Sequence, residues 1–237
     1  MNLLIVILGI VVVLLSYWIY TIYTAAPILL NNTYLGASAS QTVAPTSITD
    51  PYTSKYTIGF WIYINTFSPS IGKFLHYGTS ETKNCIFEMD ANAPILSTSI
   101  LTGVGTSQTP QIIQITDNLP IQSWVHVLVS VSSNYVDCYL NGKLLVSQQL
   151  AKPSASIPQS ANTSAEKPTL NLIGGKEVDI YITKLMRMSY PIDPQTAWTY
   201  YNQGNGNPSF SGSGSGSAYH LEIDLTKDSN KWTWQLF

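Results

Sequence analysis

The chain has 237 residues, of which only 10% are charged, with 11 Lys and Arg against 13 Asp and Glu and a formal net charge of −2. This length suits one domain of ordinary size with an anchor and tails. Because no basic patch is present that would neutralise a phosphate backbone, nucleic acid is excluded as an expected partner.

The first predicted element is a transmembrane anchor over residues 1–26. Every residue from Leu3 to Leu15 is apolar or glycine, and no charged side chain appears before Asp50. About 21 residues at 1.5 Å each span roughly 30 Å, the thickness of the hydrocarbon core of a bilayer. Aromatic rings crowd the end of the segment, where the headgroup region favours them. The residues that define this anchor are Leu3, Ile10, Leu15, Trp18, Tyr20 and Tyr23.

A cleaved signal peptide is the alternative for this segment. Three features argue against it: no Lys or Arg precedes the apolar stretch, the stretch is too long, and the small-residue site at Thr24–Ala26 is followed by Pro27. The topology stays open, because the positive-inside rule counts Lys and Arg and the first of these is Lys55.

Residues 27–50 are expected to form a spacer between the anchor and a folded domain. The segment is rich in small and polar residues and contains Pro27 and Pro45. Such composition is typical of a linker.

Strand signals dominate residues 51–203. Tyr56–Ile64 and Trp124–Val131 are rich in β-branched and aromatic residues, and Tyr135–Leu140 ends at Asn141-Gly142, the strongest short hairpin signal. Other strands are expected at Lys73–Tyr77, Cys85–Met89, Ile95–Leu101, Gln111–Ile115, Lys143–Val146, Leu170–Ile173 and Val178–Met188. Many short strands with frequent turns predict an all-β, antiparallel two-sheet jelly-roll sandwich.

One short helix is expected in this domain, at Pro194–Asn202. Asp193 suits the N-cap position, and Pro194 suits the first helical position.

Residues 204–217 form a Gly/Ser hinge, and residues 218–237 are predicted to form a C-terminal β-hairpin. A two-stranded hairpin is not stable alone in water, so it must dock on the parent domain or on another protein. The tether favours the parent domain. Its candidate partner-contact residues are Trp232, Trp234 and Phe237.

The segments Tyr56–Tyr63, Trp124–Val127, Val136–Lys143, Leu172–Gly175 and Ile180–Ile192 resemble, in order and spacing, a laminin G-like domain of the concanavalin A-like lectin/glucanase superfamily. The resemblance implies two antiparallel sheets in a jelly roll, but not one function, because this fold hosts lectins, adhesion modules, hydrolases and scaffolds. The signature residues are Trp61, Trp124, His126, Asn141 and Gly142. The architecture and composition are also similar to those of virion proteins of large DNA viruses.

No catalytic site is expected. Glucanases of this superfamily carry three acids at alternate positions, whereas Glu88-Met-Asp90 and Glu222-Ile-Asp224 each lack the third carboxylate. His126 is interpreted as a packed structural residue, and His76 and His220 stand alone on strands.

No cofactor is expected either, with calcium as the weak alternative. Its candidate ligands are Asp137, Glu177 and Asp179, which are more simply interpreted as solvated acids at strand ends. Cys85 and Cys138 are expected to be reduced thiols in the core, although spacing leaves a disulfide between them open.

The function predicted from these features is that of a non-enzymatic structural protein. It would be a single-pass minor capsid protein that links an internal virion membrane to the capsid shell, with the lipid bilayer and capsid proteins as partners. The alternative is a surface lectin-like module that binds glycans or mediates adhesion through loops at the edge of the sandwich. Such a module is expected to have exposed aromatic side chains beside Asp or Asn, together with calcium.

Overall fold

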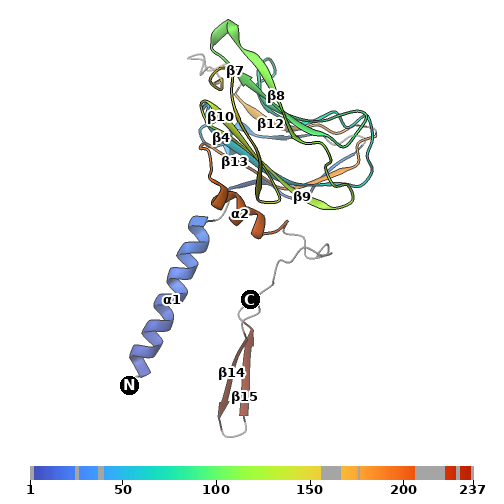
Figure 1. Cartoon of the computed structure of the whole chain (residues 1–237). Helices are drawn as coiled ribbons and strands as arrows, with labels where there is room; N and C mark the ends of the chain where they lie inside the picture. The colour runs from blue at the N-terminus through green and yellow to red at the C-terminus, as the bar shows by residue number, and fades with distance from the viewer. Residues whose placement is uncertain are drawn as a thin grey trace.

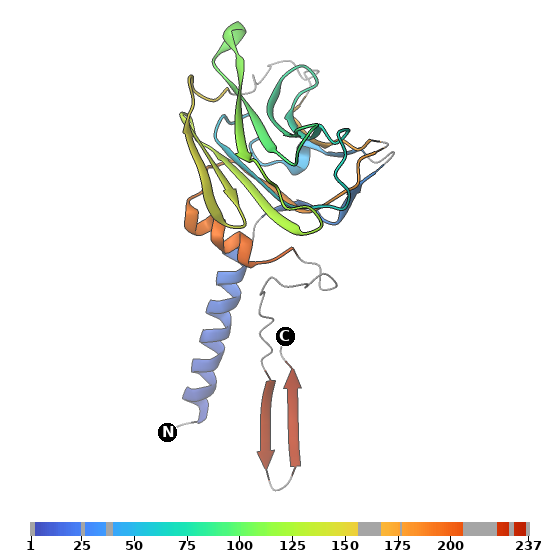
Figure 2. The same ribbon diagram turned by 45° about the vertical axis from the view of Figure 1, so that its right-hand side comes forward.

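The computed structural model describes residues 3–24, 27–36, 40–155, 167–175, 177–205, 222–227 and 230–235. Its main body is a β-sandwich from which one helix and one hairpin project (Figures 1 and 2). The predicted all-β sandwich of two antiparallel sheets is confirmed.

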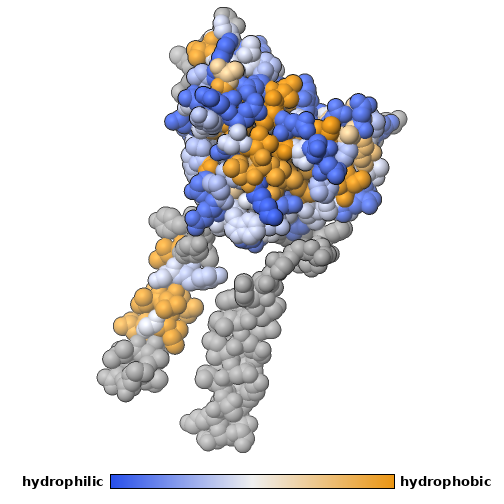
Figure 3. Space-filling model, in the orientation of Figure 1, coloured by the Kyte–Doolittle hydropathy of each residue, from blue (hydrophilic) through white to orange (hydrophobic). Residues whose placement is uncertain are grey.

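The N-terminal helix α1 (Leu3–Thr24) is present, as the apolar run predicted. Its side chains are described from Leu8 to Ile19, and all of them are exposed (Figure 3). Among the residues whose side chains are described, which in α1 are those from Leu8 to Ile19, no helix is long and apolar enough to cross a membrane.

Sheet A runs in the order β1-β13-β4-β9-β10-β11, and β2 also pairs with β13. Its strands are β1 (Ile28–Leu30), β2 (Thr33–Leu35), β4 (Tyr56–Ile64), β9 (Trp124–Val131), β10 (Tyr135–Leu140), β11 (Lys143–Gln149) and β13 (Ile180–Met188). Sheet B runs in the order β3-β12-β5-β6-β7-β8. Its strands are β3 (Gln41–Val43), β5 (Lys73–Gly78), β6 (Lys83–Met89), β7 (Leu96–Thr102), β8 (Thr109–Thr116) and β12 (Thr169–Leu172).

The segment expected to be a spacer belongs to the sandwich, which corrects the boundary placed at residue 51. Its short strands β1 and β2 pair with β13, and β3 pairs with β12. Strand triplets of this length carry too little periodicity to be recognised in the sequence. Their physical role is to pair the outer edges of both sheets, which would otherwise expose unpaired backbone groups.

Arg187 holds this N-terminal segment against the sandwich. Its guanidinium is almost fully buried and donates hydrogen bonds to the backbone carbonyls of Thr49 (2.7 Å) and Asp50 (3.2 Å). It also lies over the ring of Tyr77, with 4.6 Å between the guanidinium carbon and the ring centroid. Burial lowers the pKa of Arg187, but the carbonyls and the ring stabilise its charge.

The core lies between the two sheets. Phe60 of β4 forms edge-to-face contacts with Phe74 and Phe87 of sheet B, with ring centroids 6.0 Å and 5.0 Å apart. Cys85 and Cys138 are both free and buried in this core, so the expectation of two reduced thiols is confirmed. Burial is the main cause that raises the pKa of each thiol to about 12.

The helix predicted at Pro194–Asn202 is present as α2 with the same bounds. Asp193 caps it, because its carboxylate accepts a hydrogen bond from the backbone N–H of Thr196 at 2.8 Å. Figure 2 shows α2 packed on sheet A, on the side from which α1 projects.

The C-terminal strands β14 (Glu222–Lys227) and β15 (Asn230–Gln235) pair with each other in an antiparallel sheet of their own. Neither strand pairs with the described strands of the sandwich. The side chains of Trp232 and Trp234, and all of Phe237, lie outside the described residues, as does the hinge from residue 206. Docking of this hairpin therefore stays a prediction.

The burial of the two thiols predicts their reactivity. We expect Ellman's reagent at pH 8 to modify neither Cys85 nor Cys138 in the folded protein, because the reactive thiolate is scarce and enclosed. Addition of denaturant releases both thiols, which the reagent then counts. Rapid modification of either thiol without denaturant would contradict this packing.

Candidate functional site

The outer face of sheet A carries the candidate site. Side chains alternate between the two faces of a strand. In β4, Phe60 and Ile62 therefore point into the core, whereas Trp61 and Tyr63 point outward. Sheet A is unusual in being aromatic on the face that its partner sheet does not cover.

Helix α2 covers one half of this outer face. Leu128 of β9 and Met186 of β13 pack with Ala197 and Tyr200 of the helix in a second, smaller apolar cluster. At the end of the helix, Tyr201 stacks on Trp61 with ring centroids 5.5 Å apart and an interplanar angle of 21°.

The other half of the outer face carries four aromatic side chains on four adjacent strands, which we call the aromatic ladder: Tyr34 (β2), Tyr181 (β13), Tyr63 (β4) and Trp124 (β9). The strand register pairs each residue directly with the next. Successive ring centroids are 4.7, 6.3 and 5.5 Å apart. Three inter-strand steps make the ladder about 14 Å long.

Half of the ladder, Tyr34 and Tyr181, is open to solvent, whereas Tyr63 and Trp124 are partly buried, and polar side chains lie beside it. Tyr34 is 45% exposed and Tyr181 is 43% exposed. Asp179 accepts a hydrogen bond from the side-chain amide of Asn65 at 2.6 Å. Burial, followed by the Asp179 carboxylate, raises the pKa of Tyr34, which places this acid next to the ladder. The combination of exposed rings with a carboxylate and an amide suits a ligand that has both apolar faces and hydroxyl groups.

Of the signature residues, His126 is buried, with only 1% of its surface exposed, as expected for a packed residue. Its ring lies 5.1 Å from that of Trp61 between centroids. Burial, with a smaller contribution from the charge of Lys184, lowers its pKa to about 3, so the ring is neutral. Both ring nitrogens are nevertheless buried without a hydrogen-bond partner among the described residues.

Asn141 and Gly142 form the turn of the β10–β11 hairpin. Both have positive φ, +48° and +74°, which the favoured two-residue hairpin turn requires. The side-chain oxygen of Asn141 accepts a hydrogen bond from the backbone N–H of His126 at 2.9 Å. A Cβ atom on Gly142 would lie 2.8 Å from Trp198, so the glycine also permits α2 to pack against the turn. These two residues therefore shape the site without lining the ladder.

The weak calcium candidates are not brought together by the fold. Asp137, Glu177 and Asp179 each accept a hydrogen bond from a different neutral side chain, at 2.6 to 2.8 Å. Among the described residues, no group of three His, Cys, Asp or Glu side chains is placed to hold a metal ion.

Three other candidates from the sequence, Glu88, Asp90 and His76, belong to the sheet B side of the sandwich. Glu88 lies in β6 of sheet B, where Asp90 accepts a hydrogen bond from the backbone N–H of Asn92. His76 lies in β5 and contacts the side chain of Asn171 at 3.0 Å. His220 lies outside the described residues.

The ladder was not expected as a unit from the sequence. Tyr63, Trp124 and Tyr181 were placed in predicted strands, but their alignment depends on a register that periodicity does not give. Tyr34 was assigned to the spacer. The sequence did contain one signal: in three long strands, an aromatic residue occupies a position that alternates with core residues and therefore faces outward.

Comparison with known proteins supports the fold. A family model described as the concanavalin A-like lectin/glucanases superfamily matches residues 35–171, more than half of the chain. No curated protein matches the sequence.

Solved structures of low identity share the architecture. The receptor binding domain of botulinum neurotoxin mosaic serotype C/D is 13% identical with a TM-score of 0.55, and the match covers 76% of this chain and 44% of that chain. The binding domain of botulinum neurotoxin DC, in separate complexes with SialylT and with rat synaptotagmin II, is 15% identical with a TM-score of 0.51 and coverages of 73% and 42%. At these identities the likeness shows the fold alone. The chain spans less than half of the length of these domains.

The neutral, enclosed state of His126 predicts a pH-dependent stability. Its pKa is lower in the folded protein than in the unfolded chain, so acidification favours the unfolded chain, which takes up the proton. The contribution of neutral His126 to the free energy of unfolding is present above the unfolded pKa of about 6.5 and is lost as the pH falls toward 3. Between pH 7.5 and 5.5 we expect the free energy of unfolding to decrease by about 1 kcal/mol more than in His126→Gln. Urea titrations at both pH values measure this difference. Equal decreases in the two proteins would contradict the prediction.

Proposed function

We propose that this chain, which belongs to the concanavalin A-like lectin/glucanases superfamily, is a non-enzymatic binding protein that recognises glycans through the aromatic ladder. The observation that carries this proposal is the ladder itself. Its rings lie in one row on the outer face of sheet A, and two of them are nearly half exposed. Exposed aromatic surface of this extent is typical of a recognition site.

The chemistry beside the ladder supports a glycan as the ligand. A sugar ring has apolar faces that stack on aromatic rings and hydroxyl groups at its edge. Asp179 and Asn65 offer a hydrogen-bond acceptor and an amide next to Tyr34. The glycan-binding alternative was expected to have exposed aromatics beside Asp or Asn, which the ladder provides on the face of the sheet and not in edge loops. It was also expected to have calcium, for which the described residues offer no group of three ligands.

The fold relatives support a binding role of the same general kind. They are receptor-binding domains of botulinum neurotoxins, one in complex with SialylT and one with rat synaptotagmin II. Neither the structure nor the comparisons support the role of a minor capsid protein, which was the main expectation from the sequence. Glycan binding, the alternative, accounts better for the exposed ladder.

Glycan binding predicts that single ladder residues contribute strongly to affinity. We expect Tyr181→Ala to weaken binding on a glycan array about tenfold, because a truncated aromatic contact costs more than 1 kcal/mol at a binding hot spot. Tyr135→Ala is the matched control, since Tyr135 is 49% exposed but lies in β10, outside the ladder.

Two outcomes would contradict the proposal. One is equal binding by the Tyr181→Ala and Tyr135→Ala variants, which would remove the ladder from recognition. The other is the absence of glycan binding together with tight binding of a protein receptor.

We also propose that α1 anchors the chain in a lipid bilayer. The support is its composition: 22 residues without a charge, with large apolar side chains exposed along the described part. We expect the full chain to float with phosphatidylcholine vesicles in a density gradient. Val12→Arg combined with Leu15→Arg should abolish flotation, because each charge at the centre of a membrane helix costs about 3 kcal/mol. Flotation that is unchanged in this variant would contradict anchoring by α1.

A further inference from the structure

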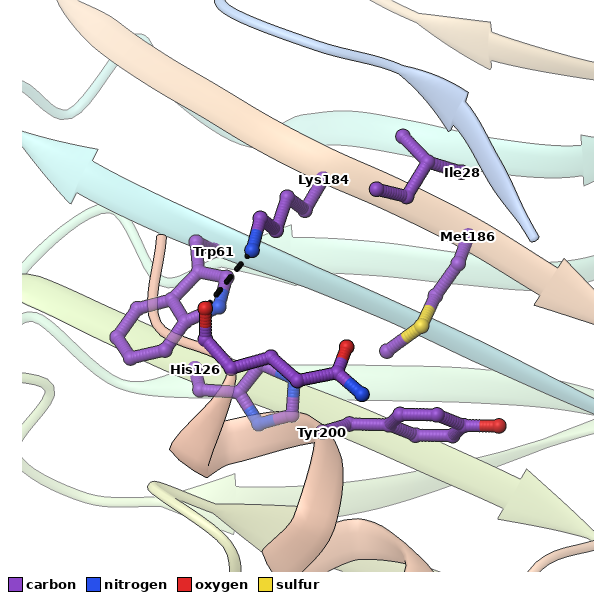
Figure 4. A pocket seen from close by; sticks show the side chains of 7 residues that line it. Ile28, Trp61, His126, Lys184, Met186 and Tyr200 are labelled. Carbon is purple, nitrogen blue, oxygen red and sulfur yellow. Dashed lines mark hydrogen bonds between the residues drawn. The ribbon is translucent and has the colours of Figure 1, made fainter. Parts of the chain in front are cut away.

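A small cavity lies on the outer face of sheet A where α2 ends (Figure 4). Its polar lining includes His126 of β9, Lys184 of β13 and Gln203, the residue that caps the end of α2, and Trp61 of β4 lies beside them. The space open to the centre of a water molecule is about 10 Å³, so the cavity accepts one oxygen atom.

Lys184 owes its position to a β-bulge. Between the pairs Thr183–Trp61 and Met186–Gly59, strand β13 has one more residue than β4. Lys184 lies in this bulge with φ +48°, a conformation that a non-glycine residue rarely adopts. Bulges of this kind redirect a side chain and occur often beside functional sites.

The Lys184 ammonium group has capacity to bind a further acceptor. It donates one hydrogen bond, to the backbone carbonyl of Gln203 at 2.9 Å, shown as the dashed line in Figure 4. A lysine ammonium group has three N–H donors. Burial lowers the pKa of Lys184, and no carboxylate among the described residues opposes this effect. The Lys184 ammonium group is therefore half-buried and has no anionic partner among the described residues.

His126 offers the second polar group of the cavity. Its two ring nitrogens are buried without a hydrogen-bond partner among the described residues, which is costly for a folded protein. A neutral imidazole has one N–H donor and one acceptor nitrogen. An oxygen atom in the cavity would satisfy that donor.

The cavity and the aromatic ladder lie on the same strands, although no ladder residue lines the cavity. Trp61 is two residues from the ladder residue Tyr63 on β4, which corresponds to about 7 Å along the strand. Lys184 follows the ladder residue Tyr181 by three positions on β13. The acid Asp179 precedes Tyr181, so it lies on the opposite side of the ladder. A ligand along the ladder thus meets a carboxylate on one side and an ammonium group on the other.

We propose that the cavity of Lys184 and His126 binds one oxygen of an anionic group, a carboxylate, carried by a saccharide that lies on the aromatic ladder. This inference rests on the proposed function and adds the charge and the orientation of the ligand. The carboxylate edge of the saccharide faces Lys184, and the opposite edge, with its neutral hydroxyl groups, faces Asp179. A hydrogen bond from an ammonium group to a carboxylate is about twice as strong as one between neutral groups, which makes the subsite selective.

The test compares acidic oligosaccharides with their neutral counterparts. The full chain, purified in mild detergent, is titrated with oligogalacturonate and with the same oligosaccharide after its carboxyl groups are reduced to alcohols. We expect the acidic form to bind at least tenfold more tightly.

Variants of Lys184 separate this subsite from the ladder. Lys184→Gly removes the ammonium group and also relieves the positive φ, so the sandwich remains folded. It should lose the preference for the acidic form and keep its affinity for the neutral one. Lys73→Gln is the matched control, because Lys73 is exposed on sheet B, and it should keep the preference.

The outcomes distinguish this inference from the proposed function. A tenfold preference that survives in Lys184→Gly, or no preference in the wild-type protein, overturns the anionic subsite and leaves glycan binding by the ladder standing. Failure of both oligosaccharides, and of every other glycan on an array, overturns both proposals. A further outcome is that free acetate competes for the cavity as effectively, mole for mole, as oligogalacturonate does. That result would show that the cavity binds a small free anion and would overturn a saccharide as its ligand.

Discussion

The register between β13, β4 and β9 is the constraint on which the rest of the protein depends. Because side chains alternate along each strand, this register puts Ile58, Phe60 and Ile62 into the core. The same alignment sends Trp61 and Tyr63 to the outer face. A shift by one residue would exchange the two sets, exposing the core and burying the ladder. The core and the exposed aromatic ladder therefore depend on one set of backbone hydrogen bonds.

The outer face is divided by the short helix that follows β13. Helix α2 buries the part of the sheet around Leu128 and Met186, and its last turn stacks Tyr201 on Trp61. The aromatic ladder begins one pleat further along the strands, where the helix has ended. The helix thus sets how much of an aromatic surface remains open, and the bulge at Lys184 places a cation at the boundary between the covered and the open half.

Much of the fold was predictable from the sequence, because the long strands have clear periodicity and Asp193-Pro194 is a specific helix start. The short strands β1 to β3 were not, since three residues give no period and their pairing is decided by distant strands. The ladder was missed for a related reason: its members are separated by up to 147 positions, from Tyr34 to Tyr181, and only the register aligns them. The cavity depends on the β-bulge at Lys184, and no local sequence pattern predicts the position of that bulge.

The connection between α1 and the sandwich restricts how the outer face of sheet A can be oriented. Helix α1 ends at Thr24 and β1 starts at Ile28. A linker of only three residues joins them, and it can span at most about 14 Å. Figures 1 and 2 place α2, and with it the outer face of sheet A, on the side from which α1 leaves. If α1 is inserted in a bilayer, the ladder faces that bilayer and not the surrounding medium. Glycans attached to neighbours on the same surface would then be within range, and those on an opposing surface would not.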